Sequence, residues 1–156
     1  MEKIKRTFIS KSAESTKSFA KNLARKIRVG DILALYGSLG AGKTTFVQGL
    51  TAGLGYKDRV FSPTFIFVRP YKLANSKQRT ANSKKRKIKI LYHIDLYRVE
   101  EETDLKTIGI EEFLTEKEAV SVIEWPEKIE NKLPAETIKI KIEVIGENER
   151  RIKVGG

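Results

Sequence analysis

The residues of this 156-residue chain with the clearest chemistry form a glycine-rich run, Gly37 to Thr44, which reads G-S-L-G-A-G-K-T. Its spacing fits G-x-x-x-x-G-K-[ST], the loop that holds nucleotide phosphates between a strand and a helix. Glycines let the backbone turn tightly and direct successive N–H groups toward an anion. In this motif the lysine, Lys43, reaches the β- and γ-phosphates, and the hydroxyl of Thr44 binds Mg²⁺. The run therefore predicts a site for a nucleoside triphosphate with its magnesium ion.

Two carboxylates elsewhere in the chain could complete such a site. Glu124 follows the mostly apolar run 119–123, and Asp95 follows the run 88–94. Mg²⁺ prefers hard oxygen ligands, and ligands of open α/β sheets bind at the carboxyl ends of the strands. Each carboxylate can equally be an ordinary acid at the end of a strand. Their residue types and positions alone leave the two interpretations open.

The segments around these residues predict strands that alternate with helices. A short buried strand over 31–36 and a helix over 43–53 flank the glycine loop, which is the context the motif requires. We expect an α/β fold, a three-layer P-loop NTPase domain with a mixed, partly antiparallel sheet that spans residues 1–156. The remaining expected strands are 4–9, 64–68, 88–95, 119–124 and a C-terminal hairpin of 137–145 with 149–154; the second and third should pair antiparallel. The expected helices are 12–28, 101–106 and 108–115, with a helical turn over 126–131.

Charge is unevenly distributed along the chain, whose formal net charge is +11. Eight basic residues and no acid lie between positions 72 and 89, and eight acids lie between positions 100 and 118. The polar stretch 74–87 is interpreted as a long, flexible basic insertion, which either contacts nucleic acid or is merely a solvated loop. The chain has no cysteine and no apolar run long enough to cross a bilayer, and its first thirty residues, which carry charges throughout, are not expected to form a secretory signal. It is expected to be soluble and cytoplasmic, with no membrane partner.

Four short motifs follow one another in a particular order. They are G-S-L-G-A-G-K-T-T-F at 37–46, S-P-T-F at 62–65, H-I-D-L-Y-R at 93–98 and E-W-P-E at 124–127. The glycine loop is common to many nucleotide-binding proteins, whereas His-x-Asp-x-Tyr-Arg followed by Glu-Trp-Pro is specific. Together they resemble the TsaE family, small bacterial ATPases required for threonylcarbamoyladenosine (t6A) modification of tRNA. The resemblance covers roughly residues 12 to 130.

The resemblance implies a role for individual positions. It makes Thr44, Glu124 and Asp95 the ligands of Mg²⁺. These three residues and Lys43 would together be the catalytic residues. Thr64 would lie near the γ-phosphate in a switch-like loop, and the start of the first helix, with Ala13, would lie beside the adenine. The implied ATP/ADP-binding residues are Ala13, Gly37, Leu39, Gly40, Ala41, Gly42, Lys43, Thr44, Thr45 and Thr64.

Other motif residues keep more than one interpretation. Trp125 would lie beside the site or simply pack in the core. His93 is expected to orient a neighbour or fill the core, and is not assigned as a base. Tyr97 and Arg98 are expected to contact a partner or a phosphate.

The family resemblance also implies partners. They would be the TsaD–TsaB heterodimer, which transfers threonylcarbamoyl to an adenosine of tRNA and which this chain would reset by ATP turnover. Two features depart from the family pattern. Ser38 stands where the family usually has an acid, which should alter hydrolysis and could strengthen nucleotide binding. The basic insertion 74–87 looks longer than usual, and we expect it to reach toward tRNA phosphates on the partner complex.

Two other functions compete with this interpretation. A small-molecule or nucleoside P-loop kinase shares the loop and uses a mobile basic lid, but the mostly lysine insertion suits such a lid poorly. An RNA-binding module that uses ATP only as a ligand ranks last, because the chain has no aromatic-glycine RNA-recognition motif.

Overall fold

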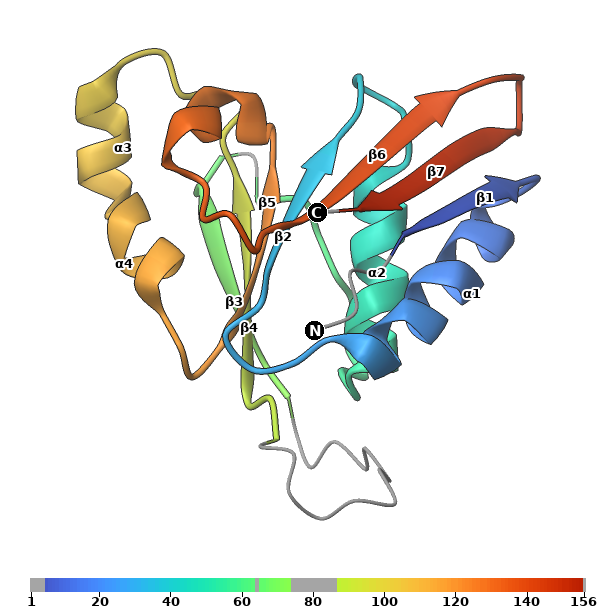
Figure 1. The fold of residues 1–156 in the computed structure, drawn as a ribbon, viewed down its shortest axis with the longest axis horizontal. Helices are drawn as coiled ribbons and strands as arrows, with labels where there is room; N and C mark the ends of the chain where they lie inside the picture. Colours follow the sequence, from blue (N-terminus) through green and yellow to red (C-terminus); the bar gives the residue numbers. More distant parts are fainter. Residues whose placement is uncertain (1–4, 64, 74–86, 156) are drawn as a thin grey trace.

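The computed structural model describes residues 5–63, 65–73 and 87–155. Within them, the strands form one seven-stranded sheet in the order β1-β7-β6-β2-β5-β4-β3 (Figure 1). The strands are β1 (Arg6–Ser10), β2 (Ile32–Tyr36), β3 (Val68–Lys72), β4 (Ile90–Asp95), β5 (Val120–Glu124), β6 (Ile138–Val144) and β7 (Arg150–Gly155). The helices are α1 (Ala13–Leu23), α2 (Lys43–Gly53), α3 (Glu102–Ile108) and α4 (Ile110–Thr115), with 3₁₀ segments η1 (Ala24–Lys26) and η2 (Pro126–Lys132).

The sheet is mixed, as the sequence predicts. Its centre is parallel, with β2 between β5 and β6 and β4 beside β5, whereas β3, β7 and β1 join it antiparallel. The register pairs Leu35 with Glu124 and Glu124 with Asp95. The carboxyl ends of three central strands therefore meet at one edge of the sheet, beside the loop that follows β2.

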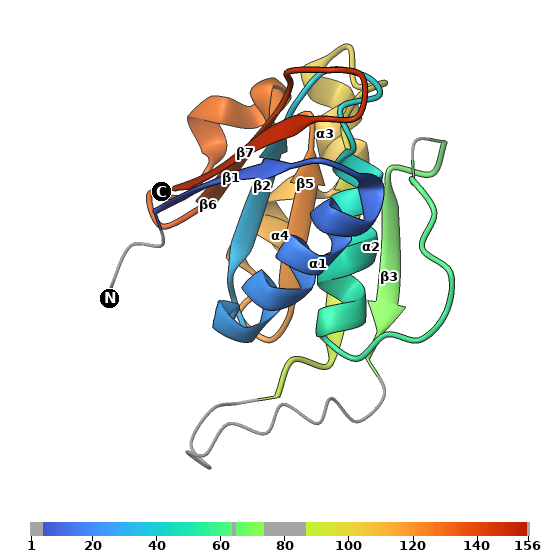
Figure 2. The same cartoon turned by 90° about the vertical axis from the view of Figure 1, so that its right-hand side faces the viewer.

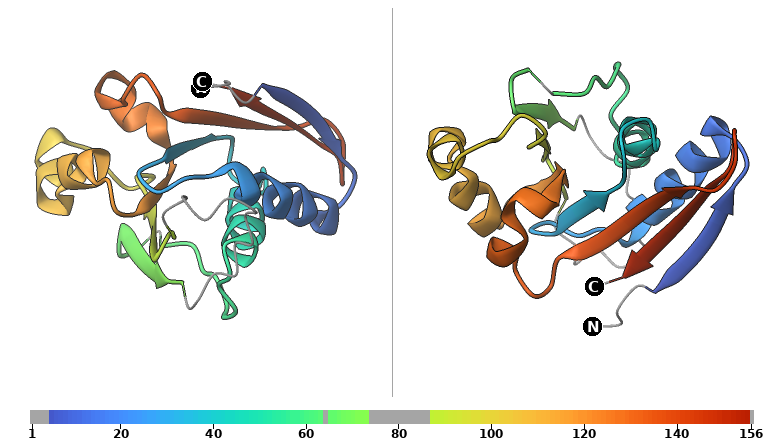
Figure 3. Two further views of the ribbon diagram at one scale, coloured as in Figure 1. Left: turned by 60° about the horizontal axis from the view of Figure 1, so that its bottom comes forward. Right: turned by 90° about the horizontal axis from the view of Figure 1, so that it is seen from above.

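Helices cover both faces of the sheet (Figures 1 and 2). Helices α1 and α2 pack on one face over a core that includes Phe46 and Leu50, and the aromatic ring of Phe19 stacks on that of Phe8. Helices α3 and α4 lie on the other face with η2, over a second core around Ile94 and Ile123 (Figure 3). Strand β5 is buried along its whole length, and its sequence is apolar apart from Ser121 and Glu124, as expected for a strand covered on both faces.

Two expected elements differ from those in the structure. The strand predicted over 64–68 is wrong, since β3 begins only at Val68 and the residues before it form a turn in which Phe67 has a left-handed φ of 62°. β-Branched and aromatic residues favour a strand in the sequence, but this turn overrides that preference.

The helix predicted over 12–28 is too long, because α1 ends at Leu23 and η1 follows it. In the turn after η1, the N–H of Arg28 donates to the carboxylate of Asp31.

The other predicted elements are confirmed to within a few residues, including α2, the β3–β4 antiparallel pair and the C-terminal hairpin of β6 and β7. Thr64 and most of the basic insertion, residues 74–86, lie outside the described residues. In the part of the chain that the structure describes, no helix has the length and apolar character needed to cross a membrane.

Candidate functional site

The glycine loop connects the end of β2 to the start of α2. Gly40 and Gly42 have φ angles of 76° and 103°, a region that side chains with a Cβ rarely adopt. Gly42 is the N-cap of α2, and its carbonyl accepts the N–H of Phe46. The first N–H groups of this 11-residue helix therefore open onto the loop, where the helix dipole favours an anion.

Lys43 is buried, with 6% of its surface exposed. Its Nζ donates to the backbone carbonyls of Gly37 and Ser38, and lies 4.1 Å from the ring centroid of Trp125. Burial lowers the pKa of Lys43 from its usual value, and the nearby carboxylates of Glu124 and Asp95 partly oppose this shift. The loop thus holds a desolvated ammonium group between its own carbonyls and an aromatic ring.

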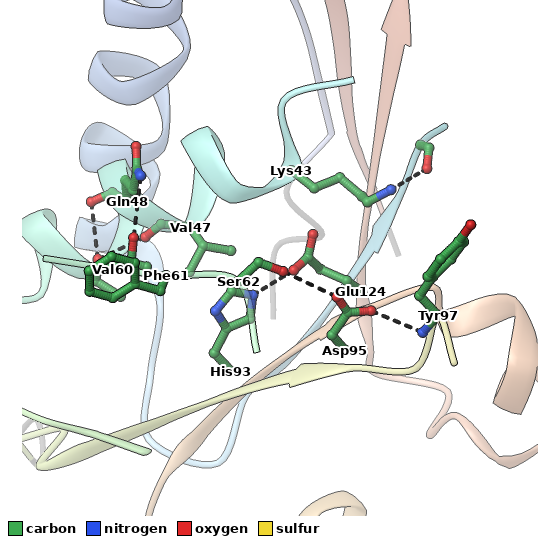
Figure 4. Close-up of polar contacts among 12 residues, drawn as sticks. Lys43, Val47, Gln48, Val60, Phe61, Ser62, His93, Asp95, Tyr97 and Glu124 are labelled. Carbon is green, nitrogen blue, oxygen red and sulfur yellow. Dashed lines mark hydrogen bonds and ion pairs between the residues drawn. The ribbon is translucent and has the colours of Figure 1, made fainter. Parts of the chain in front are cut away.

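Asp95 and Glu124 lie side by side, because β4 and β5 are parallel and pair these two residues in register. Both are buried, at 4% and 3% exposure. The Nε2 atom of His93 lies 2.7 Å from Oε2 of Glu124, and the hydroxyl of Ser62 donates to Oδ2 of Asp95 at 3.2 Å. The backbone N–H of Tyr97 donates to Oδ1 of Asp95 at 2.9 Å. Figure 4 shows this group next to Lys43.

These residues can hold a magnesium ion only together with other ligands. No cluster of three or more histidine, aspartate or glutamate side chains in the described residues could hold a metal ion. Mg²⁺ is usually bound by one or two carboxylates, with waters and substrate phosphates as the remaining ligands. A pair of buried carboxylates at the ends of two strands beside a phosphate-type loop fits that pattern. The donor set is therefore suitable for magnesium that arrives with a nucleotide.

The other predicted residues fall into two groups. Thr44 and Thr45 lie half-buried in the first turn of α2, and Ala41 is buried and donates its N–H to the carbonyl of Ser38. Leu39 is 66% exposed at the tip of the loop. Ala13 is the first residue of α1, which starts at the same end of the sheet as α2 (Figure 1). Its proximity to an adenine stays a prediction, as does the role of Thr64.

Aromatic and arginine side chains surround the acid pair. The ring of Tyr97 lies 5.1 Å from that of Trp125, so that Trp125 contacts both Lys43 and the motif that contains Asp95. Trp125 also packs against the second core, so both interpretations of this residue hold. The guanidinium of Arg98 lies 4.2 Å from the ring centroid of Phe65, which is 79% exposed. These exposed groups stand at the rim of the site.

One residue that the sequence interpretation missed is Arg150, at the start of β7. Its Nε donates to the carbonyl of Ala41 at 2.9 Å, and its Nη2 to that of Gly40 at 3.4 Å. Its Nη1 donates to the carbonyl of Glu149 in the β6–β7 turn at 3.0 Å. Arg150 thus ties the C-terminal hairpin to the back of the glycine loop. No local signal could identify it, because the contact spans 109 residues.

Comparisons with known proteins agree on one family. A family model described as "Threonylcarbamoyl adenosine biosynthesis protein TsaE" matches residues 10–152. A tRNA threonylcarbamoyladenosine biosynthesis protein TsaE from Bacillus subtilis is 38% identical over 89% of this chain and 78% of its own length. The protein of the same name from Treponema pallidum is 34% identical over 94% of this chain and 97% of its own length.

The fold comparison gives the same result. The crystal structure of YdiB from Bacillus subtilis superposes with a TM-score of 0.73 at 32% sequence identity. The match covers 99% of this chain and 86% of that one. The sequence comparison and the fold comparison therefore identify the same group of proteins. The chain that they place in this group also has the glycine loop, the acid pair and the order of motifs described above. The chain belongs to the TsaE family, which acts in the biosynthesis of threonylcarbamoyladenosine in tRNA.

Proposed function

We propose that this chain is a Mg²⁺-dependent ATPase with a P-loop NTPase fold, and that it supports t6A modification by binding and resetting the TsaD–TsaB transferase complex. One observation carries the proposal: a buried lysine, Lys43, lies between a glycine loop at a helix N-terminus and a pair of buried carboxylates, Asp95 and Glu124. This combination supplies a phosphate cradle and hard oxygen ligands at one place.

The residues of the loop would bind and orient the triphosphate. The N–H groups from Gly40 to Thr44 would contact phosphate oxygens, and the Nζ of Lys43 would exchange its carbonyl acceptors for the β- and γ-phosphates. Thr44, Asp95 and Glu124 would hold magnesium, which supplies charge neutralisation on the phosphates. Because phosphoryl transfer depends on positioning and electrostatics, this arrangement suffices for slow hydrolysis without a covalent intermediate.

His93 is proposed to position Glu124. It is fully buried, and its Nε2 contacts Oε2 of Glu124, while its Nδ1 is buried with no hydrogen-bond partner in the described residues. A group with no access to solvent is poorly placed to exchange a proton with an attacking water. Its contact fixes one oxygen of Glu124 and leaves the other available to magnesium.

The proposed partners follow from the pathway. The TsaD–TsaB pair carries out the transfer to tRNA, and this chain would act on that complex in the cytoplasm. The basic stretch 74–87 remains a proposed contact to tRNA on the complex, and Ser38 a proposed cause of altered turnover.

Trp125 gives a direct test of nucleotide binding, since it is the only tryptophan and its ring contacts Lys43. Addition of ATP with Mg²⁺ should change its fluorescence in a saturable manner, because Lys43 must move its ammonium group onto the phosphates. Calorimetric titration of both proteins with the same nucleotide should show that Lys43→Ala binds at least about 100-fold more weakly, on the scale of a lost charge-assisted contact. Equal ATP affinity of the two proteins would contradict the proposed site.

A further inference from the structure

The outer face of the sheet formed by β1, β7 and β6 carries a concentration of lysines. An open hollow on this face is lined by Lys5, Arg6, Thr7, Lys139, Lys141, Lys153, Val154 and Gly155. The alternate residues of the same strands, such as Ile140 and Ile152, point to the opposite face and pack in the core beneath α1 and α2. Figure 3 shows that no helix of the described residues covers the outer face.

The strand register brings like charges together on this face. Lys141 lies directly opposite Lys153, and Lys153 lies opposite Thr7 on its other side. Like charges directly opposite on neighbouring strands destabilise a sheet. The nearby carboxylate of Glu143 lies 3.2 Å from Lys141 and 3.9 Å from Lys153, and it also pairs with Arg151 at 3.3 Å. One acid therefore serves three cations, and the face keeps an excess of positive charge.

The chemistry of the lining favours a phosphate backbone. Lysine ammonium groups are compact point charges that suit phosphates and do not require the planar geometry of a carboxylate. Side chains two residues apart on a strand recur at about 7 Å, so Lys139 and Lys141 lie in a row, although the charge of Lys139 is paired with Glu130 at 2.6 Å. The lining contains no aromatic side chain on which a base could stack. Contact with the backbone, independent of sequence, is the mode that these residues can provide.

We propose that the outer face of β1, β7 and β6 binds the phosphate backbone of tRNA. This face is distinct from the proposed nucleotide site, and none of the residues that line it belongs to the stretch 74–87. The inference rests on the proposed role of the chain in tRNA modification, but not on ATP turnover. RNA binding and ATP hydrolysis can therefore fail separately.

The test uses a variant in which Lys5, Lys141 and Lys153 are each replaced by Gln. Lys139 is kept, because its partner Glu130 also accepts the hydroxyl of Tyr36 at 2.6 Å. Binding of an unmodified tRNA transcript to the full chain, followed by fluorescence anisotropy over a series of salt concentrations, should weaken about tenfold at low salt. The slope of log K against log[salt] should become shallower by about 3, because each of the three lost phosphate contacts removes nearly one unit.

A matched control removes the same charge elsewhere. Lys21, Arg25 and Lys26 are exposed on α1 and η1, and their replacement by Gln lowers the net charge equally. The proposal predicts a change of less than about twofold for this control. Equal weakening in both variants would show an effect of net charge alone and would overturn the proposal, as would unchanged binding in the first variant.

Competition identifies the class of partner. Poly-glutamate and an RNA of equal charge are each added to the complex of the chain with tRNA. If poly-glutamate displaces tRNA as effectively as the RNA does, the assignment to RNA is overturned in favour of an acidic protein. Weak displacement supports it. Circular dichroism and the Trp125 titration with ATP should be unchanged in both variants, since neither includes a residue of the nucleotide site. Absence of ATP hydrolysis in all proteins, with the tRNA result intact, would contradict the proposed ATPase and support this inference.

Discussion

At the residue scale, the central feature is a buried ammonium group that forms hydrogen bonds with its own loop. Lys43 donates to two carbonyls of its own loop and contacts Trp125, while two buried carboxylates lie nearby. A triphosphate that bound here would therefore replace the hydrogen bonds that Lys43 makes within the protein, and would not replace hydrogen bonds between Lys43 and water. The burial of the Lys43 side chain also disfavours the charged form of this lysine.

The lowered pKa of Lys43 predicts a dependence of stability on pH. In the native state Lys43 releases its proton at a lower pH than in the unfolded state, so between these two pKa values the unfolded state binds more protons and stability rises with pH. The window lies below the usual value of 10.5. In Lys43→Met this contribution should disappear. Chemical denaturation without nucleotide, from neutral pH to the top of that window, measures the difference. Parallel curves for the two proteins would contradict it.

The buried pair of His93 and Glu124 predicts a loss of stability when the acid is removed. Glu124→Ala should lower the free energy of unfolding by about 1–3 kcal/mol, because it leaves the Nε2 of His93 buried without this acceptor. The exposed neighbour Glu127 is the matched control, and Glu127→Ala should change stability by no more than about 0.5 kcal/mol. Urea denaturation of both variants checks the prediction. Equal effects would mean that the pair contributes no specific stabilisation.

The sequence predicted much of the candidate site at this scale, but not all of it. Lys43, Asp95 and Glu124 come together because their motifs end strands or begin a helix, and these positions can be recognised locally. The contacts of Ser62 with Asp95 and of Arg150 with the glycine loop could not be predicted. Both depend on how distant segments meet in space, and the single residues have no distinctive pattern.

At the element scale, the β6–β7 hairpin supports the glycine loop through Arg150. Arg150→Ala should weaken ATP affinity by about tenfold, because the carbonyls of Gly40 and Ala41 lose the donors that help to fix the loop. Arg150→Lys should restore little, since an ammonium cannot donate in the forked geometry of a guanidinium.

Arg151 provides the control for Arg150, because its guanidinium pairs with Glu143 on the outer face of the sheet. Its replacement by Ala should change ATP affinity less than about twofold. The Trp125 titration measures all three variants. An Arg150→Ala protein that binds ATP as the wild type does would exclude this support.

The packing of α1 on α2 depends on a close approach at Gly49. A Cβ at this position would lie 2.3 Å from the backbone carbonyl oxygen of Lys17, a contact that cannot form without moving a helix. Gly49→Ala should therefore destabilise the protein by about 2 kcal/mol, although alanine favours helices by about 1 kcal/mol over glycine. Thermal unfolding tests this against Ala52→Gly, an exposed position of α2 where only the propensity should be lost. A more stable Gly49→Ala protein would show that the helices separate without cost.

Most of the elements could be predicted because their apolar periodicity is local. The exceptions have separate physical causes. The turn before β3 contains Phe67 in a left-handed conformation that aromatic residues rarely adopt, whereas α1 passes into the 3₁₀ segment η1 at Ala24 with no glycine or proline to mark the change. The order of the sheet, with β7 between β1 and β6, also lies beyond local patterns.

At the scale of the whole molecule, charge is separated across the fold. The acidic helices α3 and α4, with Glu111 and Glu112 in the first turn of α4, cover the sheet over β5 and β4, whereas the lysines of β1, β7 and β6 lie on the same face at the other end of the sheet (Figure 1). A polyanion such as tRNA would be attracted to one side only and would approach in a preferred orientation. The proposed nucleotide site lies at the carboxyl ends of the central strands.

The central claim is ATP turnover coupled to the modification complex. The most direct measurement is Mg²⁺-dependent ATP hydrolysis by the purified chain, alone and with TsaD–TsaB and tRNA, beside Glu124→Gln and the control Glu127→Gln. We predict that the complex raises the rate, that Glu124→Gln lowers it at least about 100-fold while ATP still binds, and that Glu127→Gln changes it little. A rate that ignores the complex but rises with a small hydroxyl acceptor would contradict the account and indicate a kinase.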